Sequence, residues 1–253
     1  PRFKECTDKK ILSMLGKATD ERLFVLYEAI RRGMGIDELY RITKIDPWFL
    51  HGVKNITGFT KKPPVYKMVD TCSGEFAATT PYFYSSQNGS ENEALPFIEK
   101  SKKPRIVVLG SGPIRIGQGI EFDYACVHCI WTLKKLGYEV IVINNNPETV
   151  STDFDTGDRL YFEPLCFEDV MNIIKMEEPV GVMVSFGGGT SIKLTKKLYE
   201  HGVNIIGTSA DSIDICEDRE RFDELLAKLN IPRPQGYCVM TVEEALDAAG
   251  KLG

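Results

Sequence analysis

The chain has 253 residues, of which 43% are hydrophobic and 26% charged, with a net charge of −5. This apolar content can build one large or two ordinary globular domains, which excludes intrinsic disorder. Neither an apolar run of about 18 residues nor clustered Lys and Arg occurs in the sequence, so we expect neither a membrane nor a nucleic acid as a partner.

Residues 8–54 place apolar side chains at helical spacing, for example Leu23, Leu26 and Ile30. Asp46 followed by Pro47 is typical of a helix start and predicts a further short helix there. We therefore predict a helical hairpin or a small helical bundle within residues 1–62. The sequence Lys-Lys-Pro-Pro ends it, and we predict an irregular connecting segment over residues 63–103.

From residue 104 onward, short apolar runs alternate with helical patterns. Strands are predicted at 106–109, 140–143, 181–186 and 204–206, and helices at 122–136, 167–176 and 192–201. Such alternation predicts an α/β fold with an open parallel sheet covered on both faces. Most of these strands end in a turn rich in Gly or Asn, so the loops should gather at one edge of the sheet. A last helix begins near Thr241, where Glu244 completes a capping box.

The turn Gly110-Ser111-Gly112 follows the first strand of this region, as a dinucleotide-binding turn would. Position 115 holds Arg115 where the third glycine should stand, and the second strand ends in asparagines rather than in a ribose-binding carboxylate. A nicotinamide or flavin site is therefore disfavoured. Two interpretations remain open: an anion site formed by backbone N–H groups and Arg115, or a tight turn that simply needs glycine.

Seven cysteines are scattered along the chain. An odd, scattered set does not suggest a disulfide framework and favours a reduced, cytoplasmic compartment. Cys126, His128 and Cys129 are the one close group of metal-ligating residue types, but no second ligand pair lies near them in the sequence. We therefore expect no metal site there.

Several longer runs follow one another in a fixed order. They are IDPWFL (45–50), PVYKMVDTC (64–72), VLGSGPIRIGQGIEFDY (108–124), NNNPETVSTD (144–153), DRLYFEP (158–164), FGG (186–188), IGTS (206–209) and EDRERF (217–222). In this order the runs resemble the large chain of carbamoyl phosphate synthase.

The resemblance implies a duplicated synthetase, in which each half has a pre-ATP-grasp domain followed by an ATP-grasp domain, with a helical oligomerisation domain between the halves. Residues 1–62 would belong to the helical oligomerisation region, and residues 63–103 would connect it to the next domain. Residues 104–215 would form the Rossmann-like pre-ATP-grasp domain. Residues 216–253 would begin the small lobe of the ATP-grasp domain.

The resemblance also implies an activity, the synthesis of carbamoyl phosphate from bicarbonate, glutamine-derived ammonia and two ATP. The present region would support the half that phosphorylates carbamate, with ATP and Mg²⁺ or Mn²⁺. The implied partners are a glutaminase small chain, the rest of the large chain and further copies of the chain. The implied pathways are pyrimidine and arginine synthesis.

The resemblance also implies roles for individual residues of this chain. Arg219 matches the family's nucleotide-contacting arginine, and Arg221 is a neighbouring candidate. Alternatively, both arginines pair with acidic neighbours on a helix surface, namely Glu217, Asp218 or Glu220. Glu121 and Asp123 could equally be carboxylates that favour a helix N-terminus. The resemblance implies neither a catalytic nor a metal-binding residue in this chain. The residues expected on the wall that faces the ATP-grasp domain and an ammonia tunnel are Arg115, Glu121, Asp123, Asn146, Glu148 and Thr149.

The chain departs from the family pattern in three places. The sequence ends at Gly253, ahead of the strands and carboxylates expected to bind ATP and metal, so we expect no turnover by these residues alone. Between Ile56 and Pro63 several family helices are missing, and Gly189 stands where the family usually has Gln. These departures leave open a second hypothesis, a non-catalytic interaction or oligomerisation module derived from the enzyme.

Overall fold

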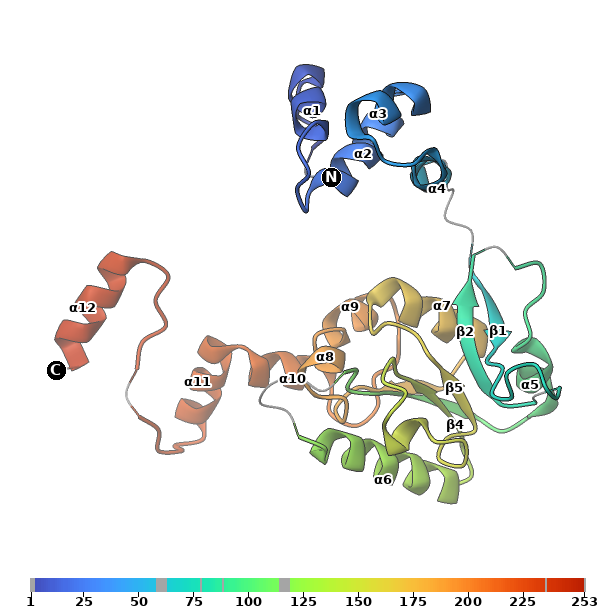
Figure 1. Cartoon of the computed structure of the whole chain (residues 1–253). Helices are drawn as coiled ribbons and strands as arrows, with labels where there is room; N and C mark the ends of the chain where they lie inside the picture. The colour runs from blue at the N-terminus through green and yellow to red at the C-terminus, as the bar shows by residue number, and fades with distance from the viewer. Residues whose placement is uncertain are drawn as a thin grey trace. The chain divides into compact units, whose positions relative to one another are not determined.

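The computed structural model describes residues 3–57, 63–77, 79–87, 89–113, 119–234 and 236–252. It divides into two compact units, Pro1–Lys62 and Pro63–Gly253. Figure 1 draws the helices of the first unit in blue and continues through green and yellow to red at the C-terminus.

Within the described part of the first unit, four helices surround one core, in agreement with the helical spacing of the sequence. The Thr7 side chain caps the first helix by accepting a hydrogen bond from the Lys10 N–H. The Asp46 carboxylate accepts one from the Trp48 N–H at the start of the fourth helix, as predicted. The helices are α1 (Asp8–Leu15), α2 (Arg22–Arg31), α3 (Ile36–Thr43) and α4 (Pro47–Thr57), and the buried core residues are Phe3, Ile11, Leu15, Val25, Leu26, Ala29, Ile30, Leu39, Leu50 and Val53.

A buried carboxylate anchors α2 to the beginning of the chain. Glu28 is 3% exposed and accepts hydrogen bonds from Arg31 at 2.8 and 2.9 Å and from Arg32 at 2.7 Å. Arg32 also donates to the carbonyl oxygens of Phe3 and Cys6. The hydrogen bonds from Arg31 and Arg32 outweigh the effect of burial and lower the pKa of Glu28 from 4.5 to about 2.

The described part of the second unit is built on a six-stranded sheet with the order β1-β2-β5-β4-β3-β6. β1 and β2 are antiparallel, and all other neighbouring strands are parallel. The predicted parallel sheet is therefore present. Its strands are β1 (Val65–Met68), β2 (Tyr82–Ser86), β3 (Arg105–Leu109), β4 (Glu139–Ile143), β5 (Arg159–Tyr161) and β6 (Gly181–Met183).

Helices cover both faces of this sheet. Successive strand residues point to opposite sides, so each face presents apolar side chains against which helices pack. Val107 and Ile141 belong to one core with α5 (Leu95–Lys100), α7 (Phe167–Glu177) and α9 (Thr195–Glu200). Val108 and Val142 belong to a second core with α6 (Glu121–Lys135). Figure 1 shows α7 and α9 on one side of the sheet and α6 on the other. All five residues of β4 are buried, which explains the continuous apolar run in the sequence.

The remaining elements are short or lie toward the C-terminus. The predicted capping box is present, since the Thr241 hydroxyl accepts from the Glu244 N–H and the Glu244 carboxylate accepts from the Thr241 N–H, both at 3.2 Å. Among the described residues, no helix has both the length and the apolar character needed to cross a membrane. The remaining elements of the second unit are η1 (Val150–Thr152), α8 (Gly188–Ile192), α10 (Ala210–Glu217), α11 (Arg219–Lys228) and α12 (Val242–Leu252).

Residues 63–103 differ from the irregular segment expected of them, since they contain β1, β2 and α5. β2 pairs with β5 and carries β1 on its other side, so the segment extends the sheet. Tyr66 and Phe83 are buried, and the Tyr66 ring lies 5.1 Å from that of Tyr161. Strands of four and five residues leave too short a pattern to identify from sequence, and pairing with the existing sheet stabilises them.

Two further strand predictions need adjustment, and one strand was missed. The missed strand is β5. The strand predicted at 181–186 is β6, which ends at Met183 rather than at Phe186. The strand predicted at 204–206 is a single parallel bridge between Ile205 and Val182. Each of these pieces is short and takes its conformation from the neighbouring strand.

A cluster of buried charges joins the amino-terminal ends of the parallel strands. Arg159 at the start of β5 donates to Glu139 of β4 at 2.6 and 3.0 Å, and to Glu177 at the end of α7 at 2.8 Å. The Tyr161 hydroxyl donates to Glu177 at 2.5 Å, and Arg105 of β3 lies 3.5 Å from Glu139. Burial by itself would lower the pKa of Arg159, but the bonds to Glu177 and Glu139 raise it above its usual value.

Replacing Arg159 with Met should leave Glu139 and Glu177 buried with only Arg105, at 3.5 and 3.9 Å, as a counter-charge for both. Removing one partner of a buried ion pair costs about 3–5 kcal/mol, so the urea midpoint of unfolding should fall sharply. The matched control is Lys134→Met, which breaks a more exposed pair with Asp158 at 3.6 Å and should cost less than about 1 kcal/mol. Equal losses in the two variants would contradict the role given to Arg159.

Glu28 should make the first unit sensitive to acid. Because its pKa is about 2 in the folded chain and ordinarily 4.5, its stabilisation is complete above pH 4.5 and is lost as the pH falls toward 2. Glu28→Gln should therefore lower stability at pH 6 and change it little at pH 2. Trp48 fluorescence during urea unfolding, in a Trp131→Phe background, reports on this unit. The exposed Glu38→Gln is the control, and an equal loss from Glu28→Gln at both pH values would refute the assignment.

Candidate functional site

The turns after the parallel strands meet at one edge of the sheet, as their sequences predicted. A side-chain carbon added at Gly187, after β6, would lie 2.3 Å from the Gly110 carbonyl oxygen, after β3. One added at Gly110 would lie 2.5 Å from Cγ of Asn144, after β4. Close approach of neighbouring turns therefore requires glycine at both positions.

The amides of the glycine turn are used within the chain. The Gly110 N–H donates to the Ile143 carbonyl oxygen at 2.9 Å, and the Gly112 N–H donates to Oδ1 of Asn144 at 3.0 Å. These two amides therefore serve the tight turn rather than an anion. Arg115, the expected cationic member of the turn, lies outside the described residues.

Asp123 fastens α6 to the loop that follows β4. Its two carboxylate oxygens accept hydrogen bonds from the Val150 N–H at 2.9 Å and the Ser151 N–H at 3.2 Å, at the start of η1. Within the same loop, the Asn146 side chain accepts from the Glu148 N–H at 3.1 Å. The Thr149 hydroxyl lies 3.3 Å from each of two neighbouring hydroxyls, those of residues 151 and 152. Asp123, Asn146 and Thr149 thus give the loop its shape.

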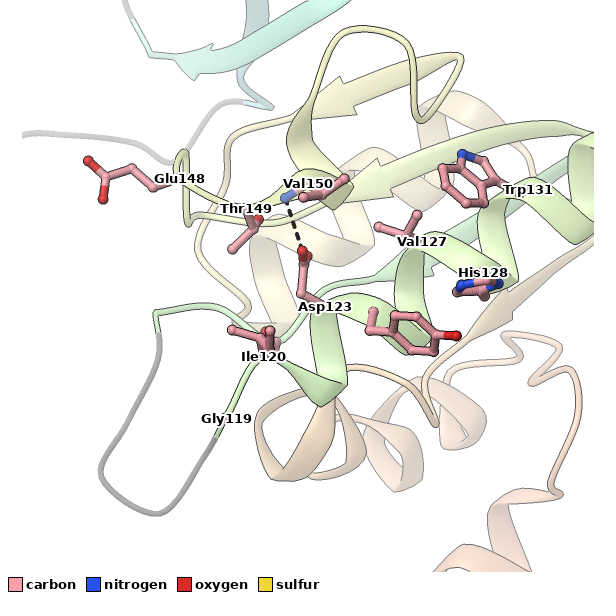
Figure 2. A pocket seen from close by; sticks show the side chains of 11 residues that line it. Gly119, Ile120, Asp123, Val127, His128, Trp131, Glu148, Thr149 and Val150 are labelled. Carbon is pink, nitrogen blue, oxygen red and sulfur yellow. Dashed lines mark hydrogen bonds between the residues drawn. The ribbon is translucent and has the colours of Figure 1, made fainter.

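The two glutamates of the predicted wall have different surroundings. Glu121 accepts a hydrogen bond from the Gly119 N–H at 3.2 Å, just ahead of α6. Glu148 is exposed, and within the described chain no hydrogen bond or ion pair involves its carboxylate. Figure 2 shows the Glu148 side chain pointing away from the α6 side chains. Of the described wall residues, Glu148 keeps its side chain available to a partner or ligand.

A pocket of about 360 Å³ lies between α6 and this loop. It brings together the predicted residues Asp123, Glu148 and Thr149, with aromatic side chains that the sequence reading had not singled out. The repeat of Tyr124, His128 and Trp131 at i, i+4 and i+7 on α6 was the available signal. The full lining is Ser111, Gly119, Ile120, Asp123, Tyr124, Val127, His128, Trp131, Glu148, Thr149 and Val150.

The two candidate arginines of α11 have different partners. Arg221 forms ion pairs with Asp214 and with Asp211, the latter at 2.8 Å, so a helix-surface pairing holds for it, with partners other than those expected. Arg219 is exposed, has no such partner in the described chain and lines a separate pocket of about 570 Å³ that also contains Phe222. Arg219 therefore has the free positive charge.

The turn after β6 carries the family departure at position 189. A side-chain carbon added at Gly189 would meet no atom within 4 Å, so the first side-chain atom of the family's Gln would meet no clash here. The difference at this position removes an amide group without closing the surface around it.

A buried acid that sequence reasoning did not single out lies beyond β5. Glu163 is 3% exposed and accepts hydrogen bonds from the N–H and the hydroxyl of Ser85 in β2, the latter at 2.9 Å. Burial raises the pKa of Glu163 despite these bonds, which favour its charged form. Its contacts make it a connection between β2 and the loop after β5. Its place in the run DRLYFEP was the only sequence signal.

The described residues contain no group of three or more His, Cys, Asp or Glu side chains able to hold a metal ion. All seven cysteines are free. Cys126 is buried, and burial raises the pKa of its thiol to about 12, which keeps it protonated.

Two family models match the chain in succession. Residues 2–70 match the large-chain oligomerisation domain of carbamoyl-phosphate synthetase, and residues 102–215 match the preATP-grasp domain of carbamoyl phosphate synthase. Two solved structures are similar to parts of the chain. One is N5-carboxyaminoimidazole ribonucleotide synthetase from Thermotoga maritima (TM-score 0.39, 21% identity, 57% of this chain and 36% of that chain), and the other a biotin carboxylase domain of a single-chain bacterial carboxylase (0.42, 15%, 58% and 34%).

A full-length relative extends the match to every residue. The carbamoyl phosphate synthase large chain of Clostridium acetobutylicum is 47% identical over 299 aligned positions, which cover 100% of this chain and 28% of that protein. The aligned stretch is 46 positions longer than the 253 residues here, so the relative has residues within it that this chain lacks. On the two domain matches and this identity, the chain belongs to the family of carbamoyl phosphate synthase large chains.

Proposed function

We propose that the chain is the central part of a large chain that makes carbamoyl phosphate from bicarbonate, glutamine-derived ammonia and two ATP, and that it supports the half that phosphorylates carbamate. The observation that carries this proposal is the 47% identity across all 253 residues. The chain spans little more than a quarter of that relative, so the activity is proposed for the whole protein rather than for these residues alone.

Arg219 is the residue we propose to contact the nucleotide. Its guanidinium has no counter-charge in the described chain and lies at a pocket of about 570 Å³, so it can meet a phosphate or ribose oxygen without first breaking an ion pair. ATP, when bound, supplies the phosphoryl group that activates carbamate. Arg221, held by Asp211 and Asp214, instead positions α11 against α10.

The loop of residues 144–153 supplies the wall of the reaction chamber in this proposal. Asp123 holds the loop against α6, and Glu148 presents a free carboxylate from it. A free carboxylate at such a wall can accept hydrogen bonds from ammonia or from the amino group of carbamate.

The partners follow from the same family membership. We propose that the first unit takes part in oligomerisation, in line with the family model that it matches, and that a glutaminase small chain delivers ammonia. We further propose that the enzyme works in the cytoplasm for pyrimidine and arginine synthesis. The odd number and scattered positions of the seven cysteines in the sequence support the proposal of a reducing compartment.

Arg219→Met in the intact large chain should weaken ATP use in the second half-reaction. Loss of a charged hydrogen bond of about 1.5–3 kcal/mol predicts a rise of roughly 10- to 100-fold in the KM for ADP when ATP is formed from carbamoyl phosphate, the reverse of carbamate phosphorylation. The bicarbonate-dependent ATPase of the first half should be unchanged. Lys228→Met, at the other end of α11, is the matched control. Equal effects on both half-reactions would contradict the assignment of this region to the second half.

Substitutions of Glu148 and of Asp123 should differ in their effects on activity and stability. Glu148→Gln removes a free charge and should lower glutamine-dependent carbamoyl phosphate synthesis with little change in stability. Asp123→Ala frees two backbone N–H groups at η1 and should cost about 1–2 kcal/mol in urea unfolding, in addition to activity. If Glu148→Gln proves as destabilising as Asp123→Ala, the carboxylate of Glu148 is structural instead.

A further inference from the structure

Three aromatic side chains form a row along the surface of α6. The ring centres of Tyr124 and His128 lie 4.2 Å apart, and those of His128 and Trp131 lie 5.4 Å apart. Tyr124 is 66% exposed and Trp131 is 45% exposed. The row forms one wall of the 360 Å³ pocket, and Val150 of the facing loop forms part of the other wall (Figure 2). An exposed row of rings beside a pocket is more than packing within the chain requires.

The charged side chains among the described residues that line this pocket are all negative. Among its described lining residues are two carboxylates, Asp123 and Glu148, and no Lys or Arg. Asp123 accepts two backbone N–H groups, which carry no net charge, and neither carboxylate has an ion pair within the described chain. A carboxylate offers about four acceptor positions, so Asp123 retains capacity for a further donor.

The N-terminus of α6 opposes this negative charge only in part. A helix N-terminus carries roughly half a positive charge. The carboxylates of Glu121 and Asp123 in the first turn carry two negative charges, and Glu148, whose side chain points away from α6 (Figure 2), adds a more distant third. Among the described residues the charge balance at the pocket is therefore negative, and the exposed ring faces also attract positive charge.

We propose that this pocket binds a small organic cation with a planar head, an amidinium or a guanidinium group, attached to an apolar body. The head lies against the aromatic row and donates to Asp123, and the body packs on Val127 and Val150. This site shares Asp123 and Glu148 with the proposed chamber wall, but benzamidine binding is measured without a nucleotide and does not involve Arg219, so its failure and the failure of the proposed function can be told apart.

Benzamidine tests the proposal, with benzamide as an uncharged ligand of the same shape. The chain has two tryptophans, so in a Trp48→Phe background the fluorescence of Trp131 reports on the pocket alone. Benzamidine should change this fluorescence with saturation, and benzamide should bind about tenfold more weakly or not at all. Equal binding of the two compounds, or a linear response without saturation, would overturn the proposal.

Variants locate the binding site on the chain. Tyr124→Ala should weaken benzamidine binding by roughly five- to tenfold, and Glu148→Gln, whose charge is more distant, by roughly two- to threefold, both with unchanged urea midpoints because both residues are exposed. Tyr199→Ala, on α9, is the matched control, since Tyr199 is 63% exposed and does not line the pocket. Binding that is unaffected by both pocket variants, or weakened equally by Tyr199→Ala, would place the ligand elsewhere and refute the site.

Discussion

The buried cluster of Arg159, Glu139 and Glu177 is the constraint on which the second unit depends. Each member comes from a different element, β5, β4 or α7, and a buried charge is tolerated only when its partners reach it. The cluster can form only in one register of these elements, and Arg105 adds β3 to the same edge. By fixing the amino-terminal ends of the strands, these charges also fix where the opposite ends, and their turns, meet.

At that opposite edge, several polar side chains form hydrogen bonds with the backbone of the chain itself. Asn144 occupies the space beside Gly110 and accepts from Gly112, while Asp123 accepts from two amides of the next loop. The result is a shaped wall with few free groups. A wall of this kind is compatible with the proposal that another domain of the enzyme works against it.

Two features of the second unit remain available for ligands. One is Arg219, a cation without a counter-charge, suited to the phosphates or ribose of a nucleotide. The other is the aromatic and acidic pocket along α6, suited to a cation. Their opposite charge preferences make them separable sites, and a ligand of one would not compete directly for the other.

The sequence by itself determined the alternation of strands and helices, because buried parallel strands such as residues 140–143 must be apolar throughout. It also indicated the gathered turns and, through long ordered motifs, the family. It did not reveal β1, β2 and α5, whose short segments are stabilised by pairing with a sheet formed elsewhere in the chain. The resemblance favoured Arg219 over Arg221, but the sequence could not show which of the two is already paired, nor could it separate Glu148 from Asp123. Only the tertiary structure decided which of these charges are already neutralised or hydrogen-bonded, because their partners lie on other elements, up to 28 residues away for Asp123.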